Sequence, residues 1–200
     1  MLDRQEIARY LGYGRKPMPP EVSALADACE RELTGGIIPR FTSRRMEADR
    51  FTADSRDLAH HLRHCREVIL YAITLGSEAD RLLRRWSVRN MAQAAVGQAV
   101  CAAWLDQLAA DYVAGLSLEE GEYLTPPFSP GYGDWSLDHQ QTVLDLLDAP
   151  RRLGLSLTRA GMLVPEKSIT ALVGVSDRPE ESCSQKCMRC KKKDCPFRAD

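Results

Sequence analysis

The chain has 200 residues, of which 44% are apolar and 28% are charged, and its formal net charge is −1 at pH 7. This length suits one domain with a continuous hydrophobic core. The balanced charge argues against a dedicated nucleic-acid-binding protein, which would carry a basic excess. No apolar run approaches the roughly 20 residues needed to span a bilayer, and the first residues lack the charged-then-apolar pattern of a secretory signal. We therefore expect a cytoplasmic protein without a membrane segment.

The first third of the chain is predicted to be mainly helical. Asp3–Tyr10 suits a short helix, and a clearer helix begins at Pro19-Pro20 and ends at Gly35-Gly36. Proline fits the first turn of a helix and glycine fits its end, which is why these pairs mark the boundaries. An extended segment at Ile37–Met46 and a polar helix at 54–64 are expected to follow.

The middle of the chain contains the run Val68–Gly76, which is apolar, partly β-branched and ends on glycine. Such a run is typical of a strand buried on both faces. Ser77 is predicted to cap the next helix. The inner side of that helix is expected to carry Ala79, Leu82, Leu83 and Trp86. A long alanine-rich helix from about Val88 to Ala114 should then form the centre of the fold.

The last part of the domain begins with a loop at 116–135 that is rich in glycine and proline. An amphipathic helix is predicted at Ser136–Leu147, with Leu137 facing inward and Pro150 ending it. Extended pieces are expected at 155–158 and 168–175. The prediction is an α+β domain over residues 1–176 and a cysteine-rich tail over 177–200.

The tail carries four of the seven cysteines, spaced Cys183-x3-Cys187-x2-Cys190-x4-Cys195. A bound cation would stabilise these neighbouring thiolates, which otherwise repel one another. Four cysteine ligands suit either tetrahedral zinc or a [4Fe–4S] cluster, and the spacing does not decide between them. The alternatives are a disordered, reduced tail that binds no metal and disulfides that form during purification. We predict a metal site at these four residues.

The other cysteines, Cys29, Cys65 and Cys101, are far apart in sequence and are expected to be structural thiols. His60 and His64 are spaced to share a helix face and could bind a metal, although a solvated polar face is the more frequent outcome. Asp134 and Asp138 flank a helix start, where carboxylates usually act as caps or as dipole partners.

The loop Pro130-Gly131-Tyr132-Gly133 comes just before a predicted helix and is a candidate ligand site. Its backbone amides and its phenol would suit the carboxylate of a polar ligand. The alternative is an ordinary turn, because glycine and proline are common there. The chain has no Walker loop, no Gly-x-Gly-x-x-Gly after a strand and no Gly-x-Ser-x-Gly elbow.

Two motifs resemble the activation domain of cobalamin-dependent methionine synthase. The first is Phe128–Asp134 followed by a helix. The second is Leu157-Thr158 and then Val164–Ala171, which is similar to the family's "LTES…M-x-P-x-x-S-V-S" stretch. Thr74-Leu75-Gly76 before a helix also fits. The cysteine tail resembles extensions of stand-alone versions of this domain.

The resemblance implies a curved, mainly antiparallel α+β fold that binds S-adenosylmethionine in a shallow groove. Ser129, Gly131 and Tyr132 would line that site. Such domains dock over a cobalamin held by another module, where one electron and the methyl group of S-adenosylmethionine convert cob(II)alamin to methylcobalamin. This chain lacks an Asp-x-His-x-x-Gly corrinoid motif. The implied partner is therefore a corrinoid-binding methyltransferase, for which this chain would be an accessory or reactivation protein.

The chain departs from the family at three positions. Pro127 stands where the family has an arginine, Ala102 where it has a glutamate, and Arg159 replaces the acid of "LTES". Proline cannot replace the bidentate grip of arginine on a carboxylate. These departures favour a second hypothesis, in which the fold is a docking or electron-delivery module that binds no methyl donor. A third is a structural protein stabilised by the metal of its tail.

Overall fold

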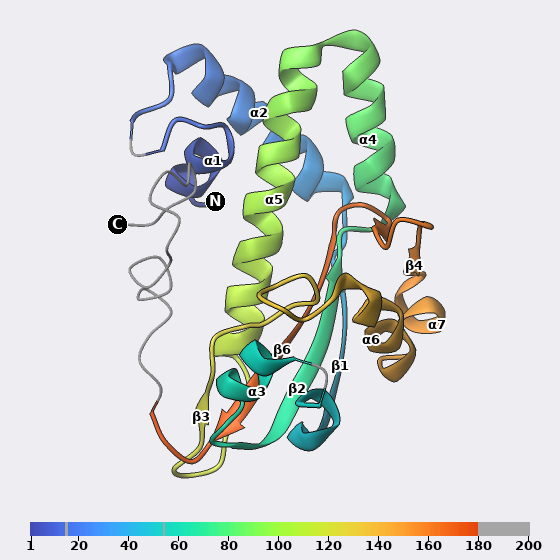
Figure 1. Cartoon of the computed structure of the whole chain (residues 1–200). Coiled ribbons are helices and arrows are strands. Elements are labelled where there is room, and N and C mark those ends of the chain that lie inside the picture. The colour runs from blue at the N-terminus through green and yellow to red at the C-terminus, as the bar shows by residue number, and fades with distance from the viewer. Residues whose placement is uncertain (15, 54, 180–200) are drawn as a thin grey trace.

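The computed structural model describes residues 1–14, 16–53 and 55–179 and shows an α+β fold (Figure 1). One antiparallel sheet has the strand order β1-β2-β6-β3. Its strands are β1 (Arg40–Glu47), β2 (Cys65–Thr74), β6 (Ser168–Ser176) and β3 (Tyr123–Leu124). A second, smaller sheet pairs β4 (Ser156–Leu157) with β5 (Leu163–Val164).

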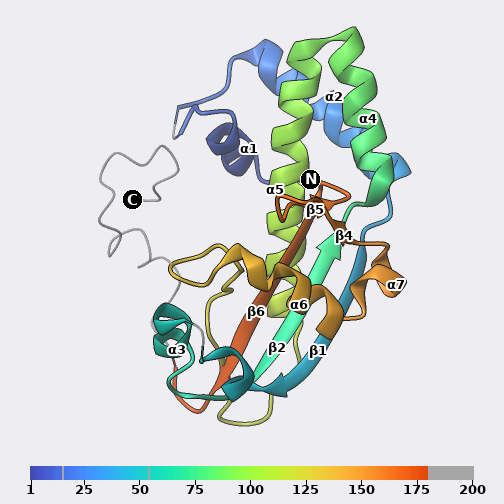
Figure 2. The same ribbon diagram turned by 45° about the vertical axis from the view of Figure 1, so that its right-hand side comes forward.

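Helices and loops cover both faces of the main sheet. In Figure 2 the sheet lies between α5 on one side and α6 on the other. The helices on one side are α1 (Arg4–Tyr10), α2 (Pro20–Gly36), α4 (Gly76–Arg89) and α5 (Met91–Ala114). The other side carries the 3₁₀ turns η1 (Ala48–Phe51) and η2 (Leu137–His139) and the helices α3 (Arg56–His61), α6 (Gln140–Leu146) and α7 (Ala149–Leu153). Within the described residues, no helix has the length and apolar character needed to cross a membrane.

β2 confirms the prediction of a strand buried on both faces. Ile69, Tyr71 and Ile73 belong to the core beneath the long helices, whereas Val68 and Leu70 belong to the core on the opposite side. Successive side chains of a strand point to opposite faces, so a two-sided burial requires an unbroken apolar run. β6 pairs with β2 over almost its full length.

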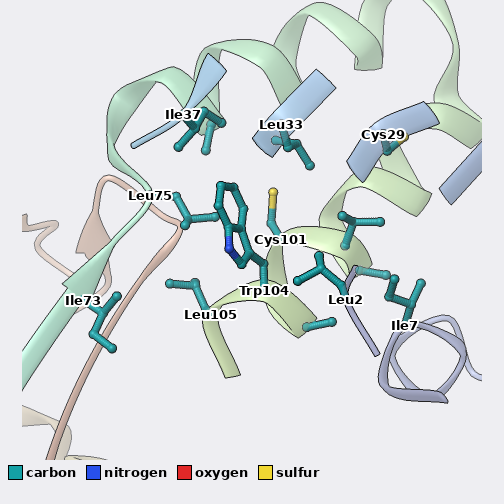
Figure 3. Close-up of a cluster of buried hydrophobic side chains, with 14 of the residues drawn as sticks. Leu2, Ile7, Cys29, Leu33, Ile37, Ile73, Leu75, Cys101, Trp104 and Leu105 are labelled. Carbon is teal, nitrogen blue, oxygen red and sulfur yellow. The ribbon is translucent and has the colours of Figure 1, made fainter. Parts of the chain in front are cut away.

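The core beneath the long helices also holds two of the isolated cysteines. In Figure 3, Cys29 on α2 and Cys101 on α5 lie among the buried side chains with Leu33 and Trp104. Burial raises the pKa of Cys29 to about 11 and that of Cys101 to about 12. Both thiols therefore stay protonated at neutral pH, which fits a structural role.

The helix termini confirm some sequence predictions and correct others. α2 begins at Pro20 and includes the glycine pair at its end. Ser77 is not the cap of α4, because the helix already begins at Gly76, whose amide donates to Thr74 Oγ1 (2.9 Å). The cap of α5, which the sequence analysis did not identify, is Asn90, whose side chain accepts from the amide of Gln93 (3.2 Å).

The predicted helix Ser136–Leu147 is divided into η2 and α6. Leu137 is 39% exposed and does not face inward, because the 3₁₀ turn rotates it away from the sheet. Pro150 does not end this helix; it lies in the first turn of α7, where its missing N–H has no cost.

The short strand β3 was missed because its sequence does not continue as a strand. After Leu124 the chain pairs with β6 through Thr125, whose amide donates to the carbonyl of Gly174 (2.9 Å). Pro126 and Pro127 have no amide hydrogen and interrupt the ladder. Pairing resumes at Phe128, so this segment follows the sheet without a strand-like pattern.

Gly97 on α5 gives a test of the packing between α4 and α5. A Cβ at this position would lie 2.7 Å from Cε3 of the Trp86 ring, whereas a Cβ at Gly35 on α2 would meet nothing. We expect Gly97→Ala to lower the free energy of unfolding by roughly 1–3 kcal/mol, because the indole must move. Gly35→Ala is the control and should be neutral or slightly stabilising. Urea unfolding measures both, and equal stabilities would contradict this account.

Candidate functional site

The loop that carries the first motif lies along the outer side of β6. Phe128 and Leu172 exchange two backbone hydrogen bonds of 2.9 and 2.8 Å. His61 on α3 holds the same segment, since its Nε2 donates to the carbonyl of Pro126 (2.8 Å). The carbonyl can only accept, so Nε2 carries the proton of this hydrogen bond.

The segment from Ser129 to Trp135 is a compact turn closed by its own backbone. The amide of Tyr132 donates to the carbonyl of Ser129 (3.0 Å), and the amide of Gly131 donates to the carbonyl of Trp135 (2.7 Å). The amide of Asp134 donates to the Asp57 carboxylate (3.1 Å). The expected cradle of free amides is therefore wrong for Gly131 and Tyr132, because the turn itself uses both donors.

Aromatic side chains pack against the apolar side of this turn. Phe128 contacts the rings of His61, Tyr132 and Trp135, with centroids 5.1, 5.9 and 6.2 Å apart. Trp135 is only 2% exposed and stacks on His139, whereas Tyr132 is 55% exposed. The apolar side of the turn is therefore fixed by ring packing, and the Tyr132 phenol stands at the surface.

Asp134 caps a helix, but a different one from the helix that follows it. Its carboxylate accepts from Ser55 Oγ and from the amides of Arg56 and Asp57 (3.0 and 3.1 Å) at the start of α3. These hydrogen bonds, that from Ser55 first, lower the pKa of Asp134 below its ordinary value. The turn at Gly133 and the start of α3 approach so closely that a Cβ on Gly133 would lie 3.0 Å from Asp57 Cγ.

A groove of about 470 Å³ lies beside this turn, between the β4–β5 hairpin loop and the start of α6. Its lining residues are Leu137, Asp138, Gln141, Leu157, Thr158, Arg159, Ala160 and Gly161. Leu137 joins the two sequence motifs: Cβ atoms built on Gly131 and Gly161 would lie 3.6 and 3.3 Å from its side chain. Two segments about 30 residues apart in sequence thus lie next to one leucine, for which the helical pattern predicts a place in the core.

Some of the residues singled out in the sequence lie beside this groove, and others lie away from it. Gly131 lies next to Leu137, Ser129 and Tyr132 lie in the adjoining turn, and Arg159 is in the wall of the groove. Pro127 lies in the loop segment beside β6, and Ala102 lies on α5.

The structure does not test the predicted metal ligands of the tail. Cys183, Cys187, Cys190 and Cys195 are outside the described residues, so the tail site stays a prediction. Among the residues the structure describes, no group of three or more histidine, cysteine or acidic side chains could hold a metal ion. His60 Nε2 instead contacts the guanidinium of Arg63 (3.2 Å), which favours the polar-face interpretation.

A second hollow, of about 570 Å³, lies between α1 and the start of α2. Arg4 lines it, but its guanidinium is bonded to Asp27 (2.7 Å) and Glu30 (2.6 Å). This cation is already neutralised by acidic partners. Lys16 also lines this hollow. We take the groove beside Leu137 as the candidate site because it adjoins the turn that carries the first motif and because Arg159 in its wall forms no ion pair within the described residues.

Comparison with known proteins finds a likeness among solved structures and none at the level of sequence. No family model matches the chain, and no curated protein matches its sequence. Among solved structures, the chain is similar to the crystal structure of the MetH reactivation domain bound to AdoHcy, with 18% sequence identity and a TM-score of 0.44. The match covers 58% of this chain and 41% of that structure, so this chain spans less than half of it.

The Asp134 cap predicts a specific dependence of stability on pH. Because the native pKa is lowered, the stabilisation is present above the pKa of the unfolded state and is lost as the pH falls through the native pKa. We expect Asp134→Asn to lower the thermal midpoint at pH 7, with a difference from wild type that shrinks toward pH 3.

The control for this cap is Asp49→Asn, because the exposed Asp49 side chain accepts no hydrogen bond within the described residues. Thermal unfolding followed by circular dichroism at several pH values measures both variants. A difference between wild type and Asp134→Asn that is constant with pH would show that the charge of Asp134 contributes nothing.

Proposed function

We propose that this chain is an accessory protein of a corrinoid-dependent methyltransferase and that it binds S-adenosylmethionine at the groove beside Leu137. The observation that carries the proposal is that Gly131 of the first motif and Gly161, which lies between the two parts of the second motif, are both next to Leu137. A groove formed beside two ordered motifs supports a role in positioning a methyl donor for a partner that carries the corrinoid.

The surface around the groove supports docking to a partner. Tyr132 and Met162 are 55% and 62% exposed, and Leu137 and Val164 are each 39% exposed. Tyr132 belongs to the first motif and Val164 to the second, Leu137 follows the first motif, and Met162 lies in the β4–β5 hairpin. A bordering apolar rim suits contact with a protein that carries the corrinoid, since exposed apolar groups are commonly covered at interfaces. S-adenosylmethionine would supply the methyl group. The corrinoid of the partner would accept this methyl group together with one electron from an external donor.

A second candidate function is a docking or electron-delivery module that binds no methyl donor. It is favoured by Pro127 and Ala102, which replace two expected ligands, and by the engaged amides of Gly131 and Tyr132. In this case an iron–sulfur cluster held by the tail cysteines would pass one electron to the corrinoid of the partner. A redox-silent zinc ion in the tail would exclude electron delivery.

The first test is calorimetric titration of the anaerobically purified protein with S-adenosylmethionine. We expect binding in the micromolar range. Tyr132→Ala should weaken it by roughly 2- to 10-fold through the loss of an aromatic contact. Tyr123→Ala removes another exposed tyrosine, on β3, and is the control that should bind as wild type does. Absence of binding by the wild type would favour the docking module.

The tail has its own test. We expect the full chain to contain one zinc ion or one [4Fe–4S] cluster, and the double variant Cys187→Ser, Cys190→Ser to lose it, because four thiolates complete either site. Metal and sulfide analysis of the anaerobic protein distinguishes the two centres. Cys65→Ala is the control and should keep the metal. Full metal content in the double variant would exclude these ligands.

A further inference from the structure

The groove beside Leu137 has one wall that donates hydrogen bonds and one that accepts them. The hairpin wall contains Thr158 and Arg159, and the opposite wall contains Asp138 and Gln141. Within residues 55–179, Arg159 and Asp138 form no ion pair with each other, although both line the same groove. The space between them can therefore receive a ligand that carries both charges.

The position of Arg159 is set by a tight turn. The amide of Thr158 donates to the carbonyl of Met162 (2.9 Å), and the amide of Gly161 donates to the carbonyl of Thr158 (3.0 Å). Thr158 Oγ1 also accepts from the amide of Met162 (3.1 Å). Three hydrogen bonds thus fix the backbone on both sides of Arg159, while its guanidinium has no hydrogen-bond partner in the described part of the chain.

The acceptor wall is prepared in a similar way. Asp138 Oδ2 accepts from Ser136 Oγ (2.9 Å), which leaves the other carboxylate oxygen available. Gln141 donates from its amide nitrogen to Asp145 (2.8 Å), so its side-chain carbonyl oxygen is also available. The start of α6 is held to the sheet by Gln140, which donates to Thr170 Oγ1 (2.6 Å). Both walls are therefore fixed relative to β6.

We propose that Arg159 binds the carboxylate of S-adenosylmethionine and that Asp138 binds its ammonium group. Arg159 and Asp138 line one groove and neither forms an ion pair within the described residues, so together they match the zwitterionic end of an α-amino acid. The nearby turn cannot bind this carboxylate through the amides of Gly131 and Tyr132, because both are bonded within the turn. The proposal rests on the proposed function, since it assigns a role within the same groove.

The test compares S-adenosylmethionine with decarboxylated S-adenosylmethionine, which lacks only the carboxylate. Calorimetric titration of the full chain should show that Arg159→Ala weakens binding of S-adenosylmethionine by about 10- to 100-fold. Binding of the decarboxylated compound should be unchanged. Arg159→Lys should fall between wild type and Arg159→Ala, because lysine keeps the charge without the planar fork. Arg84→Ala, on the exposed side of α4, is the matched control and should bind both compounds as wild type does.

The outcomes separate the two proposals. If wild type binds S-adenosylmethionine and Arg159→Ala binds it equally well, the assignment of Arg159 is overturned and the proposed function stands. If Arg159→Ala loses both compounds, the residue supports the fold of the hairpin, and the assignment is again overturned. If wild type binds neither compound, the proposed function fails together with the inference. Thermal unfolding of each variant verifies that the chain remains folded.

Discussion

β2 and β6 pair over nearly their full length, and every side chain from Val68 to Thr74 is buried. A sheet with two apolar faces must be covered twice, because each face left in water would cost about 25 cal/mol per Å² of apolar area. The long helices cover one face. The other face is covered by short helices and loops, since no long helix is available there among the described residues. Burial of these two strands therefore determines the organisation of the remaining chain.

The candidate site is a product of this second layer. Its loop crosses the sheet at Phe128, α6 is fixed to β6 through Gln140, and the hairpin leads directly into β6. Each wall of the groove is thus attached to β6, although the residues of the two walls are distant in sequence. Loops held by a rigid sheet commonly carry binding residues, because the sheet supplies positions that the loops alone could not maintain.

The predictability of the structure differs between elements for identifiable reasons. β2 and the long helices were predicted because their signals are local: an apolar run, an alanine-rich segment and proline or glycine boundaries. β3 was missed because Pro126 and Pro127 interrupt its pattern, and Leu137 was assigned inward because a helical period was assumed where the chain forms a 3₁₀ turn. The use of the turn amides and the capping of α3 by Asp134 depend on contacts between distant segments, which no local pattern records.

The way in which the sheet ends has a consequence for self-association. The outer side of β6 is occupied by β3 and by Phe128, so no further strand can be added along that part of it. The opposite margin is β1, where Arg40 and Arg44 are exposed. Two copies that joined through β1 would bring these arginines together, and this repulsion discourages pairing. A chain whose two central strands are strongly apolar, and would aggregate if uncovered, thus presents margins that resist the growth of a shared sheet.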